Sequence, residues 1–586
     1  MKAVERTRQV PASDEKPNVV LIMTDDQGWW HLGIHGNSLI ETPTMDRLAR
    51  EGVRLTNFYG SPVCTPSRAC LLTGRHYQRT GALDHVLDRD PLRTEEVTVA
   101  EIFHDHGYRT ALIGKWHLGR YMKYHPMNRG FSEFFGFWQY GFINHYFDSD
   151  ELFHNRNAIT TTGYVTDVLT DQAIEFIRLN SHRPFFLYLP YNAPHLPHLV
   201  PDAYIKKYLS KGLPFEVARL YGMITSLDDN LARLLKAIDD QGIRKRTIII
   251  YTSDHGGIDT YFRAGLRGGK GSVYEGGVRV PFIARWPGRF SENTVVESEA
   301  QHIDILPTLC ELAGIALPIQ LALDGKSITS LLITGHGASP HRYVYHQWHR
   351  ISGPRAGVER RAILDIQTGY KLVTVHPEDL NLDFDQLERE PVNSSAQWEL
   401  FDLRSDPGEK QDLSRKHPEI VVKLQRRYED WYVHVSRSQD SRMVPIEVGR
   451  RDENPVDISL LWAEPVGKEL QFTFRHYAGD SFDHWSNVKD CLRWNIDVIE
   501  EGLYDVMLEY GCHIKDAGSR VAVTACGSRL EHVVQTTGGG TIYRRFAIGS
   551  LLLKRGSTPL EIAPISIVGR ELMCLHGVCL NRKGSL

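Results

Sequence analysis

Short runs of consecutive apolar residues alternate with longer segments of helical periodicity over the first 250 residues. Four apolar runs bounded by polar residues have the length of strands, and they lie at 18–23, 109–115, 184–190 and 247–252. Continuous runs of this kind are typical of strands buried on both faces of a parallel sheet. Segments with helical spacing lie at 45–51, 100–106, 167–179 and 222–239. The alternation predicts an α/β fold with a mostly parallel sheet flanked by helices.

Polar and ionisable side chains follow each of the four predicted strands. In open α/β sheets the ligand crevice lies beyond the carboxyl ends of the strands, so we expect these side chains to share one rim. They are Asp25, Asp26, Lys115, His117, His195, Asp254 and His255.

The pattern divides the chain into four segments. Residues 1–16 are polar and predict a loose N-terminal extension, and residues 17–340 hold the alternating strands and helices. Residues 341–440 combine short strand-like runs with an amphipathic helix at 418–433, which predicts a smaller α+β subdomain. From 445 to 586, short alternating runs separated by glycine-rich turns predict an all-β, sandwich-like accessory module.

Aromatic residues in the last segment raise the possibility of carbohydrate binding. Tyr477, Phe482 and Trp485 are expected to be exposed there. A structural domain is the alternative interpretation of the same segment.

Composition and charge narrow the class of protein. The 586 residues have a formal net charge of −4, which gives no basis for general nucleic-acid binding or for a polybasic membrane patch. No apolar stretch is long enough to span a bilayer, and the first residues lack the apolar core of a secretory signal. We therefore expect neither nucleic acid nor membrane as a partner, and a cytoplasmic location for the chain as given. A periplasmic or secreted location is expected if a signal was removed, and the oligomeric state is not predicted.

The eight cysteines are spaced irregularly, so we expect most to be buried free thiols.

The strongest chemical signal is Cys64-Thr-Pro-Ser-Arg68, followed by Leu72-Thr-Gly74. An isolated cysteine is usually a small buried residue. This motif, however, resembles the signature of the type I sulfatases, arylsulfatase-like members of the alkaline-phosphatase superfamily. The resemblance extends from about residue 17 to 431 and implies that superfamily's fold.

The resemblance also implies a chemical mechanism. In that family a formylglycine-generating enzyme converts the cysteine to formylglycine, also called 3-oxoalanine. The aldehyde hydrates to a geminal diol, one hydroxyl attacks sulfur, and the second lets the sulfate leave as the aldehyde re-forms. Cys64 would therefore become the nucleophile, and the maturation enzyme would be an obligatory partner.

Three further segments resemble sulfatase motifs. In Gly114-Lys-Trp-His-Leu-Gly119, Lys115 would contact the sulfate and His117 the diol; on an extended segment the two side chains would point to the same side. His195, in Ala193-Pro-His-Leu-Pro197, and Lys270, in the segment 269–281, would contact the bridging ester oxygen and stabilise the leaving group. Arg68 would bind carboxylates on the metal side and the formylglycine.

A metal site is implied at the ends of two strands. Asp25, Asp26, Asp254 and His255, together with modified Cys64, would bind a divalent cation. Several carboxylate oxygens favour Ca²⁺. His255 is a softer ligand than the amide often found at that position, which leaves Mg²⁺ or Mn²⁺ possible.

The predicted function is hydrolysis of aryl or carbohydrate sulfate esters to alcohol and inorganic sulfate. One alternative is a formylglycine-dependent phosphonate or phosphate monoester hydrolase, in which the first metal segment tends to carry a single acid; Asp25-Asp26-Gln27 favours the sulfatase and His255 the alternative. A second alternative is a non-catalytic protein that binds sulfated glycans, but the set of catalytic residues is intact. The organic part of the substrate is not predicted. His145, His346 and His349 lie in segments expected to line the pocket, and each is interpreted as a surface histidine.

Overall fold

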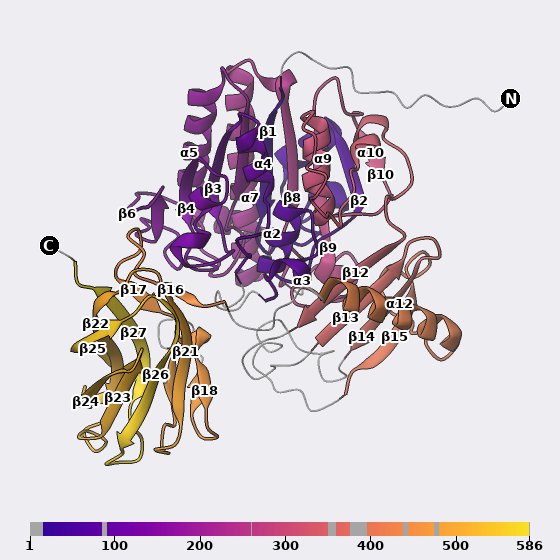
Figure 1. The fold of residues 1–586 in the computed structure, drawn as a ribbon. Helices are drawn as coiled ribbons and strands as arrows, with labels where there is room; N and C mark the ends of the chain where they lie inside the picture. The colour runs from indigo at the N-terminus through magenta and orange to yellow at the C-terminus, as the bar shows by residue number, and fades with distance from the viewer. Residues whose placement is uncertain are drawn as a thin grey trace. The chain divides into compact units, whose positions relative to one another are not determined.

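The computed structural model describes residues 16–84, 91–259, 261–349, 359–375, 395–436, 444–473 and 480–584. The chain divides into two compact units, Met1–Gln439 and Asp440–Leu586, which are described one at a time (Figure 1).

The first unit is built on a mixed sheet that has eleven strands among the described residues, with β11 paired to β2 at one end. Their order is β10-β2-β9-β8-β1-β7-β3-β4-β5-β6. Their bounds are β1 (Asn18–Thr24), β2 (Val53–Tyr59), β3 (Arg109–Lys115), β4 (Glu133–Phe137), β5 (Leu152–His154), β6 (Asn157–Ile159), β7 (Phe185–Pro190), β8 (Thr247–Ser253), β9 (Arg279–Arg285), β10 (Thr294–Val296) and β11 (Ala300–Gln301). The five central strands, β8-β1-β7-β3-β4, are all parallel, whereas β9 runs antiparallel to both its neighbours. The predicted mostly parallel sheet is therefore confirmed.

Helices cover both faces of this sheet. On one face, alternate residues of β1 such as Val20 and Ile22 pack against α1 (Pro43–Arg50), α5 (Val165–Asn180) and α7 (Phe215–Asp240). On the other face, Val19 and Leu21 pack against α2 (Cys64–Thr73), α4 (Val99–Asp105) and α9 (Ile305–Leu312). Burial on both faces explains why the central strands are continuous apolar runs.

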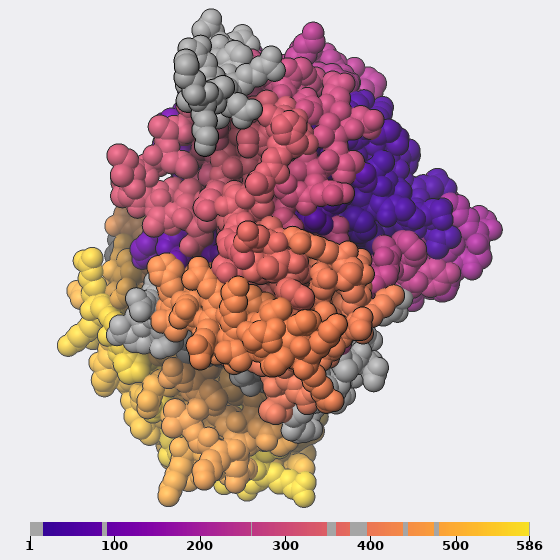
Figure 2. Space-filling view, turned by 90° about the vertical axis from the view of Figure 1, so that its right-hand side faces the viewer, coloured from indigo at the N-terminus to yellow at the C-terminus, as the bar shows by residue number. Residues whose placement is uncertain are grey.

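Among the described residues after 340, four strands form a second, antiparallel sheet in the same unit. Its order is β12 (Tyr343–His349), β13 (Glu359–Asp365), β14 (Tyr370–Val375) and β15 (Gln397–Asp402). Helix α12 (Pro418–Ser436) packs on one face through Leu424 and Tyr428. The other face contacts Val273 and Tyr274, close in sequence to Lys270. In Figure 2 the orange surface around α12 borders the red and magenta surface of the preceding residues.

The described residues of the second unit are all-β, as expected, and form two six-stranded sheets. The first contains β16 (Ile446–Val448), β18 (Glu464–Val466), β21 (Cys491–Val498), β23 (Arg520–Ala525), β24 (Ser528–Val533) and β26 (Gly556–Ser566). The second contains β17 (Val456–Ile458), β19 (Gln471–Thr473), β20 (Ser481–Asp483), β22 (Gly502–Cys512), β25 (Gly539–Leu553) and β27 (Cys574–Arg582).

The expectation that aromatic residues of this unit are exposed is wrong for two of the three. Phe482 is 3% exposed, and Trp485 is fully buried with its indole Nε1 donating to the Asp490 carbonyl at 3.0 Å. Tyr477 lies outside the described residues. The two rings belong to the core of the unit, so they offer no surface to a sugar.

Two further features of the chain are the state of its cysteines and the length of its helices. All eight cysteines are free, six of them buried, so the expected buried thiols are confirmed. None of the helices in the described ranges is both long and apolar enough to cross a membrane.

Candidate functional site

The carboxyl ends of the central strands carry the predicted site residues. Asp25 and Asp26 follow β1, Lys115 ends β3, and Asp254 and His255 follow β8. His195 lies in the segment after β7. The structure brings this set together, and all of its members except His195 are buried.

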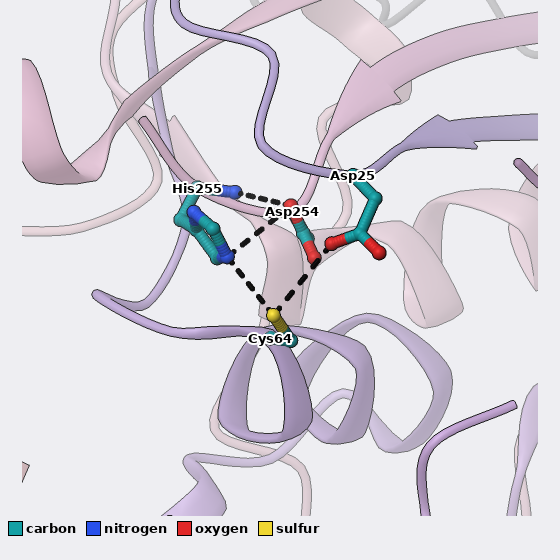
Figure 3. Close-up of side chains that lie close together, drawn as sticks. All are labelled: Asp25, Cys64, Asp254 and His255. Atoms are coloured by element: carbon teal, nitrogen blue, oxygen red, sulfur yellow. Dashed lines mark hydrogen bonds and ion pairs between the residues drawn. The ribbon is translucent and has the colours of Figure 1, made fainter. Parts of the chain in front are cut away.

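Cys64 enters the site from the first residue of α2. Val63 is extended, the helix begins at Cys64, and it ends at Thr73, before Gly74, whose φ of 67° favours glycine. Ser67 fixes the preceding turn, because its Oγ accepts from the Ser61 backbone N–H and donates to the Ser61 carbonyl, both at 3.0 Å. Cys64 Sγ lies 3.1 Å from His255 Nε2 and 3.6 Å from Asp25 Oδ1 (Figure 3). Burial raises the pKa of the Cys64 thiol well above its ordinary value, so the unmodified cysteine is a neutral thiol here.

The carboxylates converge because the chain turns sharply after β1. Asp26 has a φ of 69°, a left-handed conformation that costs about 1–3 kcal/mol for a residue other than glycine. In a continuing strand Asp25 and Asp26 would point to opposite faces. The turn instead lets both reach the site, where the Asp26 backbone N–H donates to Asp254 Oδ1 at 3.1 Å.

Each carboxylate faces its own cation. Lys115 Nζ lies 2.6 Å from Asp25 Oδ2, and Lys270 Nζ lies 2.8 Å from Asp26 Oδ1. Arg68 Nη2 lies 3.0 Å from Asp254 Oδ2 and 3.6 Å from Asp25 Oδ1.

These cations keep the acids ionised. Burial is the largest single influence on Asp26 and acts to raise its pKa, but Lys270 and the nearby histidines together lower that pKa to about 2. The pKa values of Asp25 and Asp254 are also lowered against burial, chiefly by Lys115 for Asp25 and by His255 and Arg68 for Asp254. All three carboxylates are therefore negative at neutral pH.

The same groups fit a divalent cation and an oxyanion. Ligand atoms of Asp25, Cys64, Asp254 and His255 lie within 4.8 Å of one another, as do those of Asp25, Asp26 and His195. Three carboxylates suit a hard cation, while the imidazole adds a softer nitrogen. Arg68 is fully buried, yet its Nε and Nη1 have no hydrogen-bond partner in the part of the chain that the structure describes. Because buried guanidinium donors are costly without acceptors, this arrangement suits an anionic ligand beside the metal-binding groups.

His117 does not have the extended geometry expected from its spacing. Strand β3 ends at Lys115, and His117 has a φ of 58°. Its backbone carbonyl accepts from Thr65 Oγ1 at 3.0 Å, which holds it next to the start of α2. A Cβ at Gly141 would come within 2.4 Å of His117 Nε2, so glycine at position 141 leaves room for the imidazole.

His195 lies at the partly exposed side of the site. Its ring stacks on Phe142 with centroids 5.9 Å apart, and its Nε2 lies 3.9 Å from Asp26 Oδ2. Its Nδ1 lies 2.7 Å from the Leu196 carbonyl, which assigns the Nδ1–H tautomer to the neutral ring. Burial lowers the pKa of His195, and the attraction of Asp26 only partly opposes this.

Sequence reasoning missed the pair that supports the Asp25-Asp26 turn. His31 Nδ1 accepts from the Gly28 backbone N–H at 3.0 Å, and His31 Nε2 lies 2.6 Å from Asp259 Oδ2. The two residues are 228 positions apart, so no local spacing indicates that they meet.

The three candidate pocket histidines have different positions. His145 is exposed, as expected, and its Nδ1 lies 2.8 Å from Asp150 Oδ1. His346 is 4% exposed, so its interpretation as a surface residue is wrong: β12 carries it into the interior of the unit. The side chain of His349 lies outside the described part of the chain.

Comparisons with known proteins agree with this geometry. The Sulfatase family model matches residues 17–315, and the model for the C-terminal part of N-sulphoglucosamine sulphohydrolase matches residues 269–433. Mouse arylsulfatase J is 32% identical over 464 residues, which cover 72% of this chain and 77% of that protein.

Solved structures show the same fold. A crystal structure of Ps i-CgsB in complex with k-i-k-neocarrahexaose aligns with a TM-score of 0.63 and 28% identity, covering 73% of this chain and 94% of the other. The phosphonate monoester hydrolase of Agrobacterium radiobacter, at 20% identity and a TM-score of 0.53, covers 77% of this chain and 98% of its own and is alike in fold alone. With its family-wide match and the convergence of Cys64, Asp25, Asp254 and His255, this chain belongs to the sulfatase family and is a sulfuric ester hydrolase.

Proposed function

We propose that this sulfatase acts on aryl or carbohydrate sulfates through a formylglycine made from Cys64, with Ca²⁺ as the bound cation. The observation that supports this most directly is the position of Cys64 Sγ, between Asp25 Oδ1 and His255 Nε2 at the start of a buried helix. In this proposal Sγ stands in for an oxygen of the hydrated formylglycine. A formylglycine-generating enzyme is the partner that makes the modification.

Asp25, Asp26, Asp254 and His255 would hold the cation, along with the modified residue at position 64. When bound, the ion would supply positive charge to the sulfate oxygens, and the formylglycine diol would supply the nucleophilic oxygen. Mg²⁺ or Mn²⁺ in place of Ca²⁺ is the alternative that His255 allows.

Arg68 and Lys115 are proposed to bind the sulfate. Arg68 has buried donors without partners, and a guanidinium fork suits an oxyanion. Lys115 Nζ is fully buried beside Asp25, which orients its ammonium group. His117 is proposed to hold the proton of the nucleophile, because its backbone carbonyl accepts a hydrogen bond from Thr65, the residue after Cys64.

Lys270 and His195 are proposed to serve the leaving group. Both lie against Asp26, Lys270 at 2.8 Å and His195 at 3.9 Å. Asp26 raises the pKa of Lys270 well above its ordinary value, against the effect of burial, so Lys270 stays an ammonium donor to the bridging ester oxygen. The partly exposed His195 can reach the same oxygen from the side where the alcohol departs.

The test of this assignment is the mass of the tryptic peptide 55–68, after co-expression with a formylglycine-generating enzyme. The proposal predicts a peptide lighter by the difference between a thiol and an aldehyde. The same peptide from a Cys64→Ala variant is the control. An unmodified thiol under these conditions would remove the proposed nucleophile.

A further inference from the structure

Arg263 lies on the segment that leads from the metal-binding pair Asp254-His255 to Lys270. Its Nε donates to the Asp259 carbonyl at 2.8 Å. Its Nη2 would lie 3.5 Å from a Cβ at Gly269, so the guanidinium sits directly beside the residue before Lys270. Arg263 and Gly269 are both partly exposed, unlike Lys270 itself.

Among the described residues, no carboxylate forms an ion pair with Arg263. Asp259, the acid closest to it in sequence, is already occupied: its Oδ2 accepts from Trp30 Nε1 at 3.0 Å and contacts His31 at 2.6 Å. Its Oδ1 accepts from the Tyr261 backbone N–H at 3.1 Å. Burial lowers the pKa of Arg263 despite the attraction of Asp259, as expected for a cation without an ion-pair partner.

Arg267, four residues later, provides the contrast. Its Nη1 lies 3.0 Å from Glu399 Oε2 and donates to the Glu409 carbonyl at 3.0 Å. Its guanidinium also stacks over Tyr274 at 4.1 Å. Arg267 is therefore anchored to Glu399 of β15 and to Glu409, whereas no such ion pair of Arg263 is found among the described residues.

A continuous series of contacts links Arg263 to the reaction centre and beyond it. Gly269 adjoins Lys270, which pairs with Asp26, and Asp26 faces His195. His195 stacks on Phe142. The inner members of the series are buried, and the outer members Arg263, His195 and Phe142 are partly exposed. These outer residues are accessible to the alcohol part of a substrate, unlike the buried inner ones.

We propose that Arg263 forms a subsite for a second anionic group, a sulfate or a carboxylate, on a sulfated glycan. Phe142 supports the apolar face of the sugar that carries the scissile sulfate. A guanidinium binds such oxyanions through two parallel hydrogen bonds, which a lysine cannot reproduce. This subsite rests on the proposed function of the site and adds to it a preference for doubly charged substrates.

The experiment compares three substrates on the matured, Ca²⁺-loaded enzyme: a nitrophenyl sulfate, a monosulfated disaccharide, and the same disaccharide with a second anionic group. Arg263→Met is expected to lower kcat/KM for the doubly charged disaccharide by about 10–100-fold, mainly through KM, because charged hydrogen bonds are lost. Rates on the two singly charged substrates should stay unchanged. Arg263→Lys should recover part of the loss, and the loss should shrink at high salt.

Arg178→Met is the matched control, because Arg178 is an exposed arginine of α5 paired with Glu175. It should leave all three rates unchanged. Equal rates of wild type and Arg263→Met on the doubly charged substrate would overturn the subsite, as would a loss shared by all three substrates. If the wild type hydrolyses nitrophenyl sulfate but Arg263→Met matches it on the doubly charged substrate, the subsite alone is refuted. If the wild type hydrolyses none of the three substrates, the proposed function is refuted as well.

Discussion

Two clusters of buried charge lie in the first unit, and they differ in what their charges leave unsatisfied. The rim cluster contains Asp25, Asp26 and Asp254 with Arg68, Lys115 and Lys270. The second cluster lies where the two sheets meet: Lys371 Nζ is 2.9 Å from Glu275 Oε1 and 2.9 Å from Glu409 Oε1. The Glu275 backbone N–H donates to Glu409 Oε2 at 2.7 Å.

The second cluster also has neighbours outside the trio: Tyr59 Oη donates to Glu275 Oε2 at 3.2 Å, and Arg279 Nη1 lies 4.0 Å from the same oxygen. One lysine serves two acids, so burial outweighs its attraction and raises the pKa of Glu409 to about 7. In the rim cluster each acid has its own cation, the pKa values of the acids are lowered, and Arg68 retains donors without partners. The comparison teaches that burial of charge does not itself indicate a functional site. The rim cluster differs in combining ionised acids with buried guanidinium donors that lack partners among the described residues.

The largest expected effect concerns the rim cluster. Cys64→Ala should lower the rate of sulfate release by at least about 10³-fold, because the nucleophile is lost. Its free energy of unfolding should change by only about 1 kcal/mol. Initial rates and urea unfolding measure the two quantities. Cys70→Ala is the matched control, since Cys70 is a buried thiol of the same helix and should keep its activity.

The second cluster should respond in the opposite way. Lys371→Met should lower the free energy of unfolding by about 3–5 kcal/mol, because two buried acids lose their cation. Lys115→Met, made in the rim cluster and measured with Ca²⁺ present, should cost mainly activity. Urea unfolding of both variants checks this, and a Lys371→Met protein as stable as the wild type would erase the distinction between the clusters.

The pH dependence of stability should locate the raised pKa in the second cluster. Glu409 has an ordinary pKa of 4.5 and a folded pKa of about 7, so the folded state binds more protons between these values. Its contribution to stability is thus fully present below pH 4.5 and is lost as the pH rises through 7. Relative to wild type, Glu409→Gln should gain up to roughly 3 kcal/mol between pH 4.5 and 8. Parallel stability curves for the two proteins would contradict this.

Cation binding should stabilise only through the rim cluster. Free Ca²⁺ at 100 times its Kd should raise the free energy of unfolding by about 2.7 kcal/mol, and chelation should reverse the effect. Asp254→Asn should abolish this gain, whereas Glu409→Gln should retain it. Thermal unfolding with and without Ca²⁺ measures both, and a gain that survives Asp254→Asn would place the ion elsewhere.

The sequence was most informative where one pattern carried both fold and chemistry. Strand β3 has the bounds expected from its apolar run, and β1, β7 and β8 differ from expectation by one residue at one end. Because parallel strands place their carboxyl ends together, the acids and cations after them could be expected at one rim. The antiparallel strand β9 was not expected, since a buried apolar strand has the same pattern in either direction.

What the sequence did not indicate depends on tertiary contacts. His117 leaves the extended conformation, and His31 meets Asp259 across 228 residues. His346 and Trp485 are both buried, although each lies in a segment that suggested exposure. For His31 and His117 the partners, Asp259 and Thr65, are distant in sequence, so no local periodicity contains the information.

The most direct test of the central claim is to compare sulfate and phosphate release from matched aryl esters. The same matured, Ca²⁺-loaded preparation is used for both, with Cys64→Ala as the blank. The account predicts faster release of sulfate by the wild type and no release above background by Cys64→Ala. Faster release of phosphate, or sulfate release by Cys64→Ala equal to that of the wild type, would contradict it.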